Sequence, residues 1–265
     1  KLYRFRLNGK GGNVSGTLYI PSTIQENNAF EVVKRKISDI SQIFKHIIRK
    51  VIIDTKDSAQ GELSESHIDY LFVDPPFGGN LMYSELNFLW EDWLGVYTNN
   101  KTEAIINKEQ QKGLSEYQSL MEACFIEFHR LLKPGRWMTV EFHNSQNSVW
   151  NSIQEALLRA GFVPADVRTL DKKQAAFMQI QAAAAVKQDL VISAYKPAAE
   201  FERKFSVEGG TVSAAWEFVR QHLEQLPMPN LAEGRVQVQG ERMPYLLYDR
   251  MVAFHLVRGL TVPLS

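Results

Sequence analysis

The sequence contains one cysteine, Cys124, and no apolar segment long enough to span a membrane. A single cysteine excludes a disulfide framework and a zinc site made of several cysteines of this chain, and we predict no metal site. There is also no charged-then-apolar leader typical of a signal peptide. These absences predict a soluble, cytoplasmic protein that does not act at a membrane.

The chain also lacks net charge, because 30 basic residues balance 30 acidic residues. No global field therefore attracts nucleic acid. Residues 1–50 differ, since they carry ten Lys or Arg against three acidic residues, which leaves +7. This segment is either a solvated helix face or a phosphate-contacting surface, to which Arg4, Arg6, Lys34 and Lys36 would contribute.

Residues 68–79 are the part of the sequence that most clearly points to a site. The apolar run Ile68–Val73 predicts a parallel strand covered on both faces. Pro75 and Pro76 then end the strand, because neither has an N–H to donate. Asp74, a free carbonyl and Phe77 are left at the carboxyl edge of a sheet, where open α/β folds place ligands. The alternative is a solvated Pro-Pro turn.

Strand patterns and helix patterns alternate along the chain, which predicts an α/β fold with helices on both faces of a sheet. We expect strands at Leu2–Leu7, Thr17–Ile20, Val51–Asp54, Ile68–Val73, Trp137–Phe142, Ala165–Leu170 and Leu190–Tyr195, with a further candidate at Arg235–Val238. We expect helices from Phe30 to Ile47, from Tyr83 to Leu94, from a Ser115–Gln118 capping box to Leu131, from Trp150 to a Gly161 C-cap, and at Val212–Leu226 and Pro244–Arg258.

Three parts follow from this pattern. Residues 1–50 form an N-terminal hairpin and a basic amphipathic helix, residues 51–197 a catalytic segment, and residues 198–265 a mostly helical extension. Apolar residues recur at steps of three and four from Phe30 to Ile47, so they form one stripe along the helix, and we interpret this stripe as core. Cys124 falls on the apolar face of the Ser115–Leu131 helix and is interpreted as core rather than as a nucleophile.

The residues Asp74–Phe77 resemble motif IV of the S-adenosylmethionine-dependent amino-methyltransferases, (Asp/Asn/Ser)-Pro-Pro-(Tyr/Phe/Trp). Asp74–Leu86 together with Leu132–Asn144 resembles large bacterial adenine-specific DNA methylases, and the resemblance extends from about Arg4 to Pro197 and more weakly to the end. It implies a Rossmann-like methyltransferase sheet with one late antiparallel strand. It also implies S-adenosyl-L-methionine as cofactor, double-stranded DNA as partner, and a restriction-modification or related defence system.

The sequence departs from this family in one respect. Such enzymes hold the methyl donor on a loop of the form Phe-x-Gly-x-Gly, and no stretch matches it, since Gly78-Gly79 and Gly209-Gly210 have other neighbours. We therefore expect a partial sheet that lacks the first strands. The loop would then lie on a missing N-terminal part of the same enzyme or on another chain, such as a restriction or defence subunit.

The motif residues suit chemistry on an exocyclic amine. The lone pair of such an amine is delocalised into the ring, and two acceptors at its hydrogens would free it. Asp74 would supply one acceptor and the Pro75 carbonyl the other, while Pro76 restricts the direction of that carbonyl. Phe77 would offer a flat face to a base taken out of the stack. Positioning and electrostatics would carry the rate, without a covalent intermediate.

Other residues are candidates for binding. We predict Asp57, Asp74 and Gly78 at the cofactor, with a turn or helix cap as the alternative for Asp57. Tyr83, His143, Asn144 and Phe77 would line the substrate pocket, although polar residues at a strand end also satisfy backbone groups. A helix cap explains Ser84 and Glu85 equally well. Lys172, Lys173 and Gln174 either touch DNA or form a solvated loop.

We thus predict the catalytic segment of a DNA adenine-N6 methyltransferase. An N4-cytosine enzyme, an RNA-base or protein-amide methyltransferase, and a non-catalytic DNA-binding or assembly fragment are the alternatives. The encoding gene would separate the enzyme from the non-catalytic fragment, because an upstream Phe-x-Gly-x-Gly segment favours the enzyme.

The absence of the glycine-rich loop leads to a direct prediction. The 265-residue chain alone should bind S-adenosylmethionine weakly or not at all, because the loop that holds the donor is missing from it. Isothermal titration calorimetry measures this affinity. Micromolar binding by the purified chain would show that the donor site lies within these residues.

Overall fold

A computed structural model describes residues 3–4, 12–13, 28–44, 52, 56–144, 146–170, 189–228, 231–232, 235–236 and 240–263. The chain divides into two compact units, Lys1–Thr55 and Lys56–Ser265. The three-part division drawn from the sequence stays a prediction.

In the first unit the structure describes two short strands and one helix. Strand β1 (Tyr3–Arg4) pairs antiparallel with β2 (Gly12–Asn13), and α1 spans Ala29–Phe44. The predicted strand at Thr17–Ile20 lies outside the described residues, as does the one at Val51–Asp54 except for Ile52.

Helix α1 forms where the apolar period predicted it, with the Asn28 carboxamide accepting from the Phe30 N–H (2.9 Å) as an N-cap. The apolar side chains of its described residues are not buried, however, and their exposed fractions lie between 39% for Val32 and 85% for Phe30. The interpretation of this stripe as core was therefore wrong for the described residues. Among the described residues of this unit, only the two-residue strands β1 and β2 accompany the helix, and they are too short to form an apolar layer over its face.

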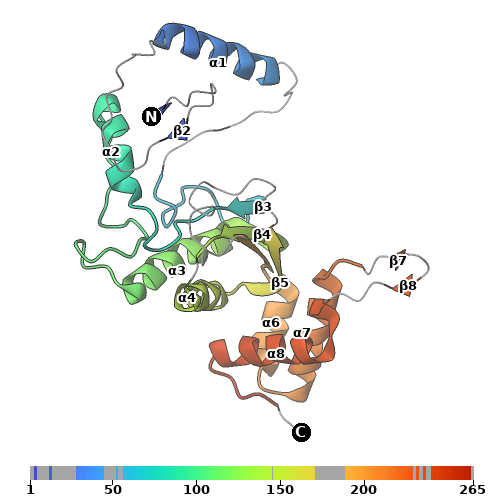
Figure 1. The fold of residues 1–265 in the computed structure, drawn as a ribbon. Coiled ribbons are helices and arrows are strands. Elements are labelled where there is room, and N and C mark those ends of the chain that lie inside the picture. The colour runs from blue at the N-terminus through green and yellow to red at the C-terminus, as the bar shows by residue number, and fades with distance from the viewer. Residues whose placement is uncertain are drawn as a thin grey trace. The chain divides into compact units, whose positions relative to one another are not determined.

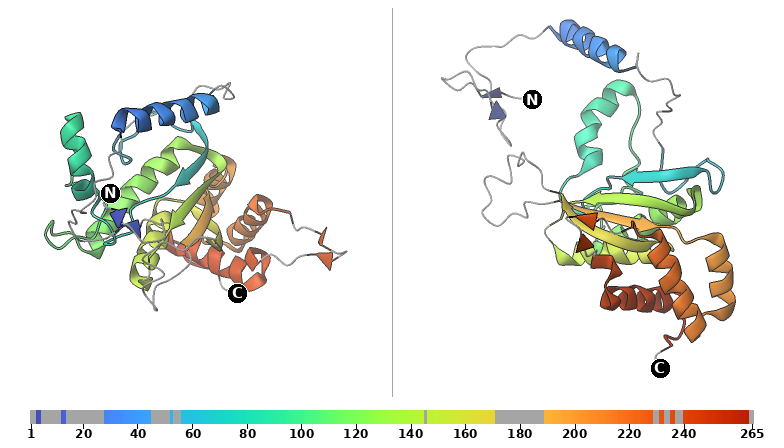
Figure 2. Two further views of the ribbon diagram at one scale, coloured as in Figure 1. Left: turned by 45° about the horizontal axis from the view of Figure 1, so that its top comes forward. Right: turned by 90° about the vertical axis from the view of Figure 1, so that its right-hand side faces the viewer.

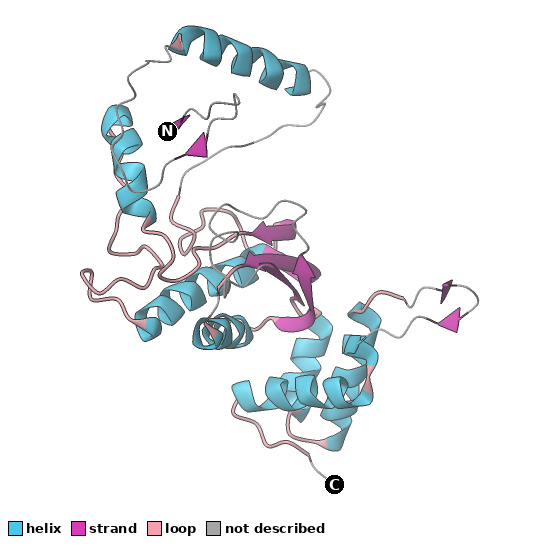
Figure 3. Cartoon of the chain, viewed as in Figure 1, coloured by secondary structure: helices cyan, strands magenta, loops and turns pink. Residues whose placement is uncertain are grey.

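The second unit is built on a four-stranded sheet in the order β3-β4-β6-β5 (Figures 1 and 3). The strands are β3 (Ile68–Val73), β4 (Leu132–Phe142), β5 (Val163–Leu170) and β6 (Asp189–Tyr195). Strands β3 and β4 are parallel, whereas β6 runs antiparallel to both of its neighbours. The predicted α/β class, with one late antiparallel strand, is confirmed.

Helices α3 (Leu114–Leu131) and α4 (Asn147–Arg159) cover one face of this sheet, as the two views of Figure 2 show. The buried side chains of this layer come from both helices and from β4 and β6. They include Tyr117, Met121, Phe125, Ile153, Leu157, Met138, Val140, Phe142, Ile192 and Ala194.

The N-terminus of α3 differs from the prediction, and the structure also shows the environment of Cys124. The helix begins at Leu114, and the Glu116 carboxylate accepts from the Gly113 N–H (2.8 Å), so the Ser115–Gln118 capping box was wrong. Burial raises the pKa of Cys124 to about 11. Its thiol therefore stays protonated at neutral pH, which disfavours a role as nucleophile, while Cys124 itself is half-buried.

Strand β3 lies at an edge of the described sheet. Leu71 and Val73 pack on the buried layer, but Tyr70 and Phe72, on the opposite face, are 54% and 60% exposed. The expectation that this strand is covered on both faces was wrong for the described residues. Strand β4 begins at Leu132, five residues before the predicted Trp137, and in this added part the pairing register shifts and Gly135 adopts a φ of 72°.

The C-terminal extension consists mainly of α6 (Ala199–Glu208), α7 (Val212–Gln225) and α8 (Pro244–Val257). The short elements β7 (Leu231–Ala232), β8 (Arg235–Val236) and a 3-10 turn (Gly240–Arg242) connect α7 to α8. The sequence had predicted α7 and α8. It missed α6, in which only Phe201 and Phe205 are buried among charged residues.

The extension shares a core with the sheet. Side chains of the three helices pack on Tyr195 of β6, which by strand alternation lies on the face opposite Ala194. Helices thus flank the sheet on both faces, as expected. The shared core comprises Val163, Ala165, Tyr195, Phe201, Phe205, Phe218, Met251 and Phe254. No helix in the described ranges is long and apolar enough to cross a membrane.

His222 of α7 is fully buried in this core. Its Nδ1 lies 2.8 Å from the Tyr195 hydroxyl, and its ring stacks on Phe218. Burial first, and then the charges of Arg250 and Arg242, lower the pKa of His222 to about 4. The imidazole is therefore neutral in the folded protein.

We predict that this histidine makes the protein less stable in mild acid. The folded pKa lies below the unfolded value, so its contribution is complete above pH 6.5 and is lost as the pH falls toward 4. From pH 7 to pH 5 the loss should be about 2 kcal/mol in the free energy of unfolding. Urea titrations at both pH values measure it.

The control is His222→Gln, which cannot titrate. His129, whose pKa is also lowered to about 4 by burial, remains in that variant and keeps its own share of the pH dependence. An unchanged slope in His222→Gln would contradict the assignment.

Candidate active site

The loop that follows β3 is held by hydrogen bonds to its carbonyl oxygens. The Tyr117 hydroxyl of α3 donates to the Pro76 carbonyl (2.7 Å). The Asn144 amide, just past β4, donates to the Phe77 carbonyl (2.8 Å). The backbone N–H of Ile106 donates to the Gly78 carbonyl (3.3 Å). Three consecutive carbonyls are thus fixed by three different parts of the chain.

The Pro75 carbonyl differs from these three. No hydrogen bond from the residues that the structure describes reaches it. It adjoins Asp74, which is exposed at the carboxyl end of β3, while Pro75 itself is buried. The Asp74 carboxylate is therefore followed, at the strand end, by a carbonyl that accepts no hydrogen bond from the described part of the chain.

Gly78 has a conformational role. It adopts a φ of 73°, in the left-handed region that favours glycine. A Cβ there would also lie 3.4 Å from side-chain atoms of Asn144, Ile106 and Val149. The glycine thus lets the chain turn beneath its neighbours. Its predicted part in holding a cofactor stays a prediction.

Phe77 is half-buried, and its ring has packing partners. It meets Phe142 edge-to-face, with 5.4 Å between centroids and an interplanar angle of 89°, and lies 6.2 Å from the His143 ring. Phe77 therefore contributes to the core. Its predicted role as a platform for a base stays a prediction.

His143 and Asn144 lie beside this loop because β3 and β4 are parallel neighbours with Val73 opposite Val140. Asn144 is buried and satisfied on both sides of its amide, since its Oδ1 also accepts from the Gln146 N–H (2.7 Å). Asn80 donates to the His143 carbonyl (3.4 Å). Asn144 thus forms hydrogen bonds with backbone groups. This is the alternative to lining a substrate pocket that the sequence had left open.

Tyr83 begins α2 (Tyr83–Leu94) and is half-buried near Asp74. Burial, and then the negative charges of Asp74 and Glu103, raise the pKa of Tyr83. Its hydroxyl is therefore neutral at physiological pH and can donate a hydrogen bond, within range of the charge of the candidate acceptor carboxylate. The structure thus brings Tyr83 together with the motif loop.

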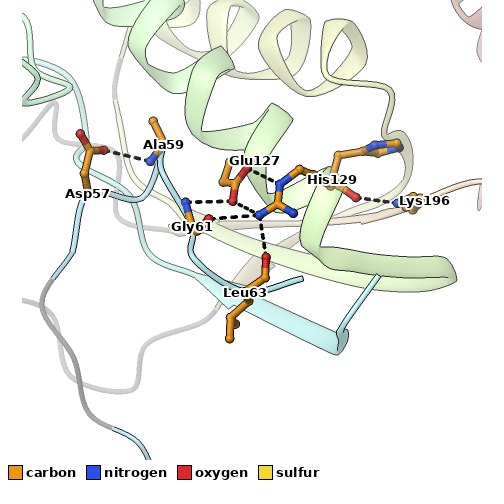
Figure 4. Close-up of polar contacts among 8 residues, drawn as sticks. Asp57, Ala59, Gly61, Leu63, Glu127, His129 and Lys196 are labelled. Carbon is orange, nitrogen blue, oxygen red and sulfur yellow. Dashed lines mark hydrogen bonds and ion pairs between the residues drawn. The ribbon is translucent and has the colours of Figure 1, made fainter. Parts of the chain in front are cut away.

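Asp57 has a different environment, shown in Figure 4. Its Oδ1 accepts from the Ala59 N–H (2.9 Å) within a turn. The charge of Asp57 also acts on Cys124 of α3. Cys124 comes seven residues after Tyr117, so the part of α3 near Asp57 is roughly 10 Å along the helix from the residue that holds the motif loop. The turn-cap role, one of the two alternatives, is observed. The predicted contact with a methyl donor stays a prediction.

The segment after this turn is clamped to α3. The Glu127 carboxylate accepts from the Gly61 N–H (2.9 Å) and from the Arg130 guanidinium (2.6 Å), and Arg130 also donates to the Leu63 carbonyl (2.9 Å) (Figure 4). A Cβ at Gly61 would collide with the Glu127 carboxylate. Lys196 caps the same helix by donating to the His129 carbonyl (2.8 Å).

The sequence analysis missed three residues of the site. Tyr117 lies within the predicted Ser115–Leu131 helix and was not singled out, although a buried tyrosine hydroxyl usually finds a partner. Glu103 and Ile106 lie in a loop between two helices, where no periodic pattern marks them. The available signal for a role of Glu103 was its position directly before three apolar residues, Ala104-Ile105-Ile106.

Two further predictions concern the surroundings of the site. Lys172, Lys173 and Gln174 lie outside the described residues. Within the part of the chain that is described, no group of three histidine, cysteine or acidic side chains could hold a metal ion.

Comparison with known proteins gives structural similarities only. No protein-family model matches the sequence, and no curated protein does. Solved structures that align with the chain include TTHA0409 of Thermus thermophilus, described as a DNA modification methylase (12% identity, TM-score 0.31, 60% of this chain and 58% of that one). M1.HpyAVI in complex with SAM (16%, 0.27, 65% and 54%) and the cyclase SpnF (13%, 0.36, 63% and 64%) are others.

The chain thus spans 54–64% of the length of these three proteins. At TM-scores below 0.5, these alignments do not identify its activity. The architecture stated above rests on the strand order and directions of the chain itself.

The hydrogen bond between Tyr117 and Pro76 gives a prediction on stability. Tyr117→Phe should lower the free energy of unfolding by about 1–2 kcal/mol, because it leaves the Pro76 carbonyl unpaired beneath α3. Chemical denaturation measures the change, and amide hydrogen exchange at Phe77 and Gly78 locates it.

A matched control removes the same atom elsewhere. Tyr70 donates to the Thr139 hydroxyl (2.7 Å) on the exposed face of the sheet. Tyr70→Phe should therefore change stability by less than about 0.5 kcal/mol. Equal effects of the two substitutions would contradict a special role for the buried bond.

Proposed function

We propose that this chain is the catalytic segment of an S-adenosylmethionine-dependent methyltransferase that methylates the exocyclic N6 amine of adenine in double-stranded DNA. The observation that supports it most is the pair formed by the exposed Asp74 carboxylate and the adjoining Pro75 carbonyl. Among the described donors none occupies that carbonyl, although the next three carbonyls all have partners. An amine carries two hydrogens, and the pair offers two adjacent acceptors.

The acceptors would act by changing the geometry of the amine. Hydrogen bonds from its two hydrogens to Asp74 and Pro75 favour a pyramidal nitrogen, whose lone pair is no longer shared with the ring. As positive charge develops on the nitrogen, the carboxylate stabilises it. Because the loop is already fixed through Pro76, Phe77 and Gly78, little reorganisation is required.

S-adenosyl-L-methionine would supply an electrophilic methyl group on a cationic sulfur. The exposed Asp74 carboxylate fits the neighbourhood of such a cation, and Gly78 keeps the chain free of a side chain where the loop turns. Asp57 is a further candidate to accept a hydrogen bond from the adenine amine of the methyl donor, in addition to its observed role in a turn. The sequence contains no Phe-x-Gly-x-Gly loop for the remainder of the donor.

A base in duplex DNA would have to leave the stack to reach Asp74. Phe77 and His143 provide ring surfaces beside the acceptors, and Tyr83 provides a neutral hydroxyl donor. Such a donor could pair with a ring nitrogen next to the amine. Adenine and cytosine both have one there, so duplexes containing a single type of target base would separate N6-adenine from N4-cytosine methylation.

The central prediction concerns Asp74. In the intact enzyme, Asp74→Ala should lower the rate of methyl transfer on the order of 10²–10³-fold, because a preorganised partner of the developing charge is lost. The fold should survive, since the side chain is exposed. Incorporation of labelled methyl into duplex DNA at saturating donor measures the effect, and kcat should change far more than donor affinity.

Asp69→Ala is the matched control. Asp69 is on the same strand at its entry, where it is exposed and pairs with Lys133 (2.8 Å), so its loss should leave the rate unchanged. If Asp74→Ala retained more than about a tenth of the wild-type rate, the catalytic assignment would fail. Phe77→Tyr should be nearly silent, whereas Phe77→Ala should weaken base capture and, through its contact with Phe142, stability.

A further inference from the structure

The segment Glu103–Ile106 contacts both sides of the candidate site. At one end, the Ile106 N–H donates to the Gly78 carbonyl (3.3 Å). At the other, the Glu103 carboxylate accepts from the Ser84 N–H (2.9 Å) and from the Ser84 hydroxyl (2.6 Å). Four consecutive residues thus connect the loop after Asp74 with the first turn of α2.

This connection is the main attachment of α2 that the structure shows. The helix buries none of its residues, so core packing does not fix it. Its N-cap residue, Met82, makes no side-chain hydrogen bond to the first turn, and the Glu103 carboxylate fills that role at Ser84 instead. A carboxylate at a helix N-terminus is also favoured by the helix dipole.

Glu103 is itself held firmly. It is 9% exposed, and its backbone carbonyl accepts from the Lys112 ammonium (2.7 Å), which also donates to the Asn100 carbonyl. The adjoining Ile105 is completely buried. The carboxylate therefore projects toward Ser84 from a fixed backbone.

We propose that Glu103 is a positioning residue, which holds Tyr83 beside Asp74 by anchoring the first turn of α2 to the loop that carries the acceptors. The proposal rests on the proposed function, because Tyr83 matters to the reaction only if a base binds at Asp74. Glu103 does not touch the reacting atoms. It acts through Ser84, the next residue after Tyr83.

A spectroscopic experiment tests the positioning without any assay of activity. The 265-residue chain is labelled with ¹³C in its tyrosine rings, and the Tyr83 signal is assigned by its loss in Tyr83→Phe. Asp74→Asn should shift this signal at neutral pH, because a charge near the phenol is removed. In a Glu103→Ala background the same substitution should no longer shift it.

Two milder variants guard against a loss of folding in Glu103→Ala. Ser84→Ala removes the hydroxyl bond but keeps the N–H bond, and Glu103→Gln keeps one acceptor oxygen, so both should give a reduced response. Glu109→Ala, at an exposed acid of the same loop, should leave the response unchanged. A full response in Glu103→Ala and in Ser84→Ala would overturn the proposal.

Kinetics of the intact enzyme provide the second test. Glu103→Ala should lower kcat/KM between about tenfold and a hundredfold, as expected for a displaced binding group. In a Tyr83→Phe background it should have almost no further effect, because both changes remove the same interaction. Equal losses in the two backgrounds would show that Glu103 does not act through Tyr83.

The two tests fail for different reasons. If the intact wild-type enzyme transferred no methyl group to DNA, the proposed function would be wrong, and the tyrosine signal would still decide whether Glu103 holds Tyr83 beside Asp74. If methyl transfer occurred but the signal responded to Asp74→Asn in every variant, only the role of Glu103 would be wrong.

Discussion

Two consecutive prolines impose the constraint on which the site depends. Pro75 and Pro76 have no N–H groups, so the chain beyond β3 cannot continue the sheet. The carbonyls that follow must find donors elsewhere, since an unpaired buried carbonyl costs about 1–3 kcal/mol. Tyr117, Asn144 and the Ile106 N–H are those donors. The Pro75 carbonyl, which accepts no hydrogen bond from the described residues, adjoins Asp74.

This arrangement explains why the surrounding elements are where they are. The donors to Pro76 and Phe77 are 41 and 67 residues away in the sequence, so the loop acquires its shape only when α3 and the end of β4 have docked. Asn144 also connects the loop to α4. Its amide donates to the Phe77 carbonyl of the loop, and its backbone carbonyl accepts from the Trp150 indole of α4 (3.0 Å). A substitution at any of these positions should disturb the same few backbone atoms.

Much of the fold could be predicted from the sequence because periodic patterns report burial. Helix α2 has the predicted bounds, and the late antiparallel strand β6 is where the resemblance implied it. His143 and Asn144 lie beside the loop after β3 because β3 and β4 are parallel neighbours. The predictions on burial of α1 and β3 failed because an apolar pattern states what a segment could bury, not whether a partner covers it.

The site itself was harder to predict than the fold. Asp74, Pro75 and Phe77 were found because prolines after an apolar run have a local meaning. Tyr117 and Glu103 act across long sequence separations, and single polar atoms decide their roles. No periodicity encodes such a contact, and the Glu103 loop lacks any regular element. Only the packed structure brings these atoms within hydrogen-bond distance.

The two sides of the site are held by different forces, and this difference has a consequence for the reaction. The acceptor loop is fixed by bonds to buried residues of α3 and of the segment after β4, which resist local opening. Helix α2 buries no residue and is fastened mainly at its first turn through Ser84. Elements with few buried contacts open at low free-energy cost. A rigid pair of acceptors beside a lightly anchored helix would let a bulky ring enter next to Tyr83 while Asp74 and Pro75 keep their geometry. Amide exchange in α2 should therefore be faster than in α3.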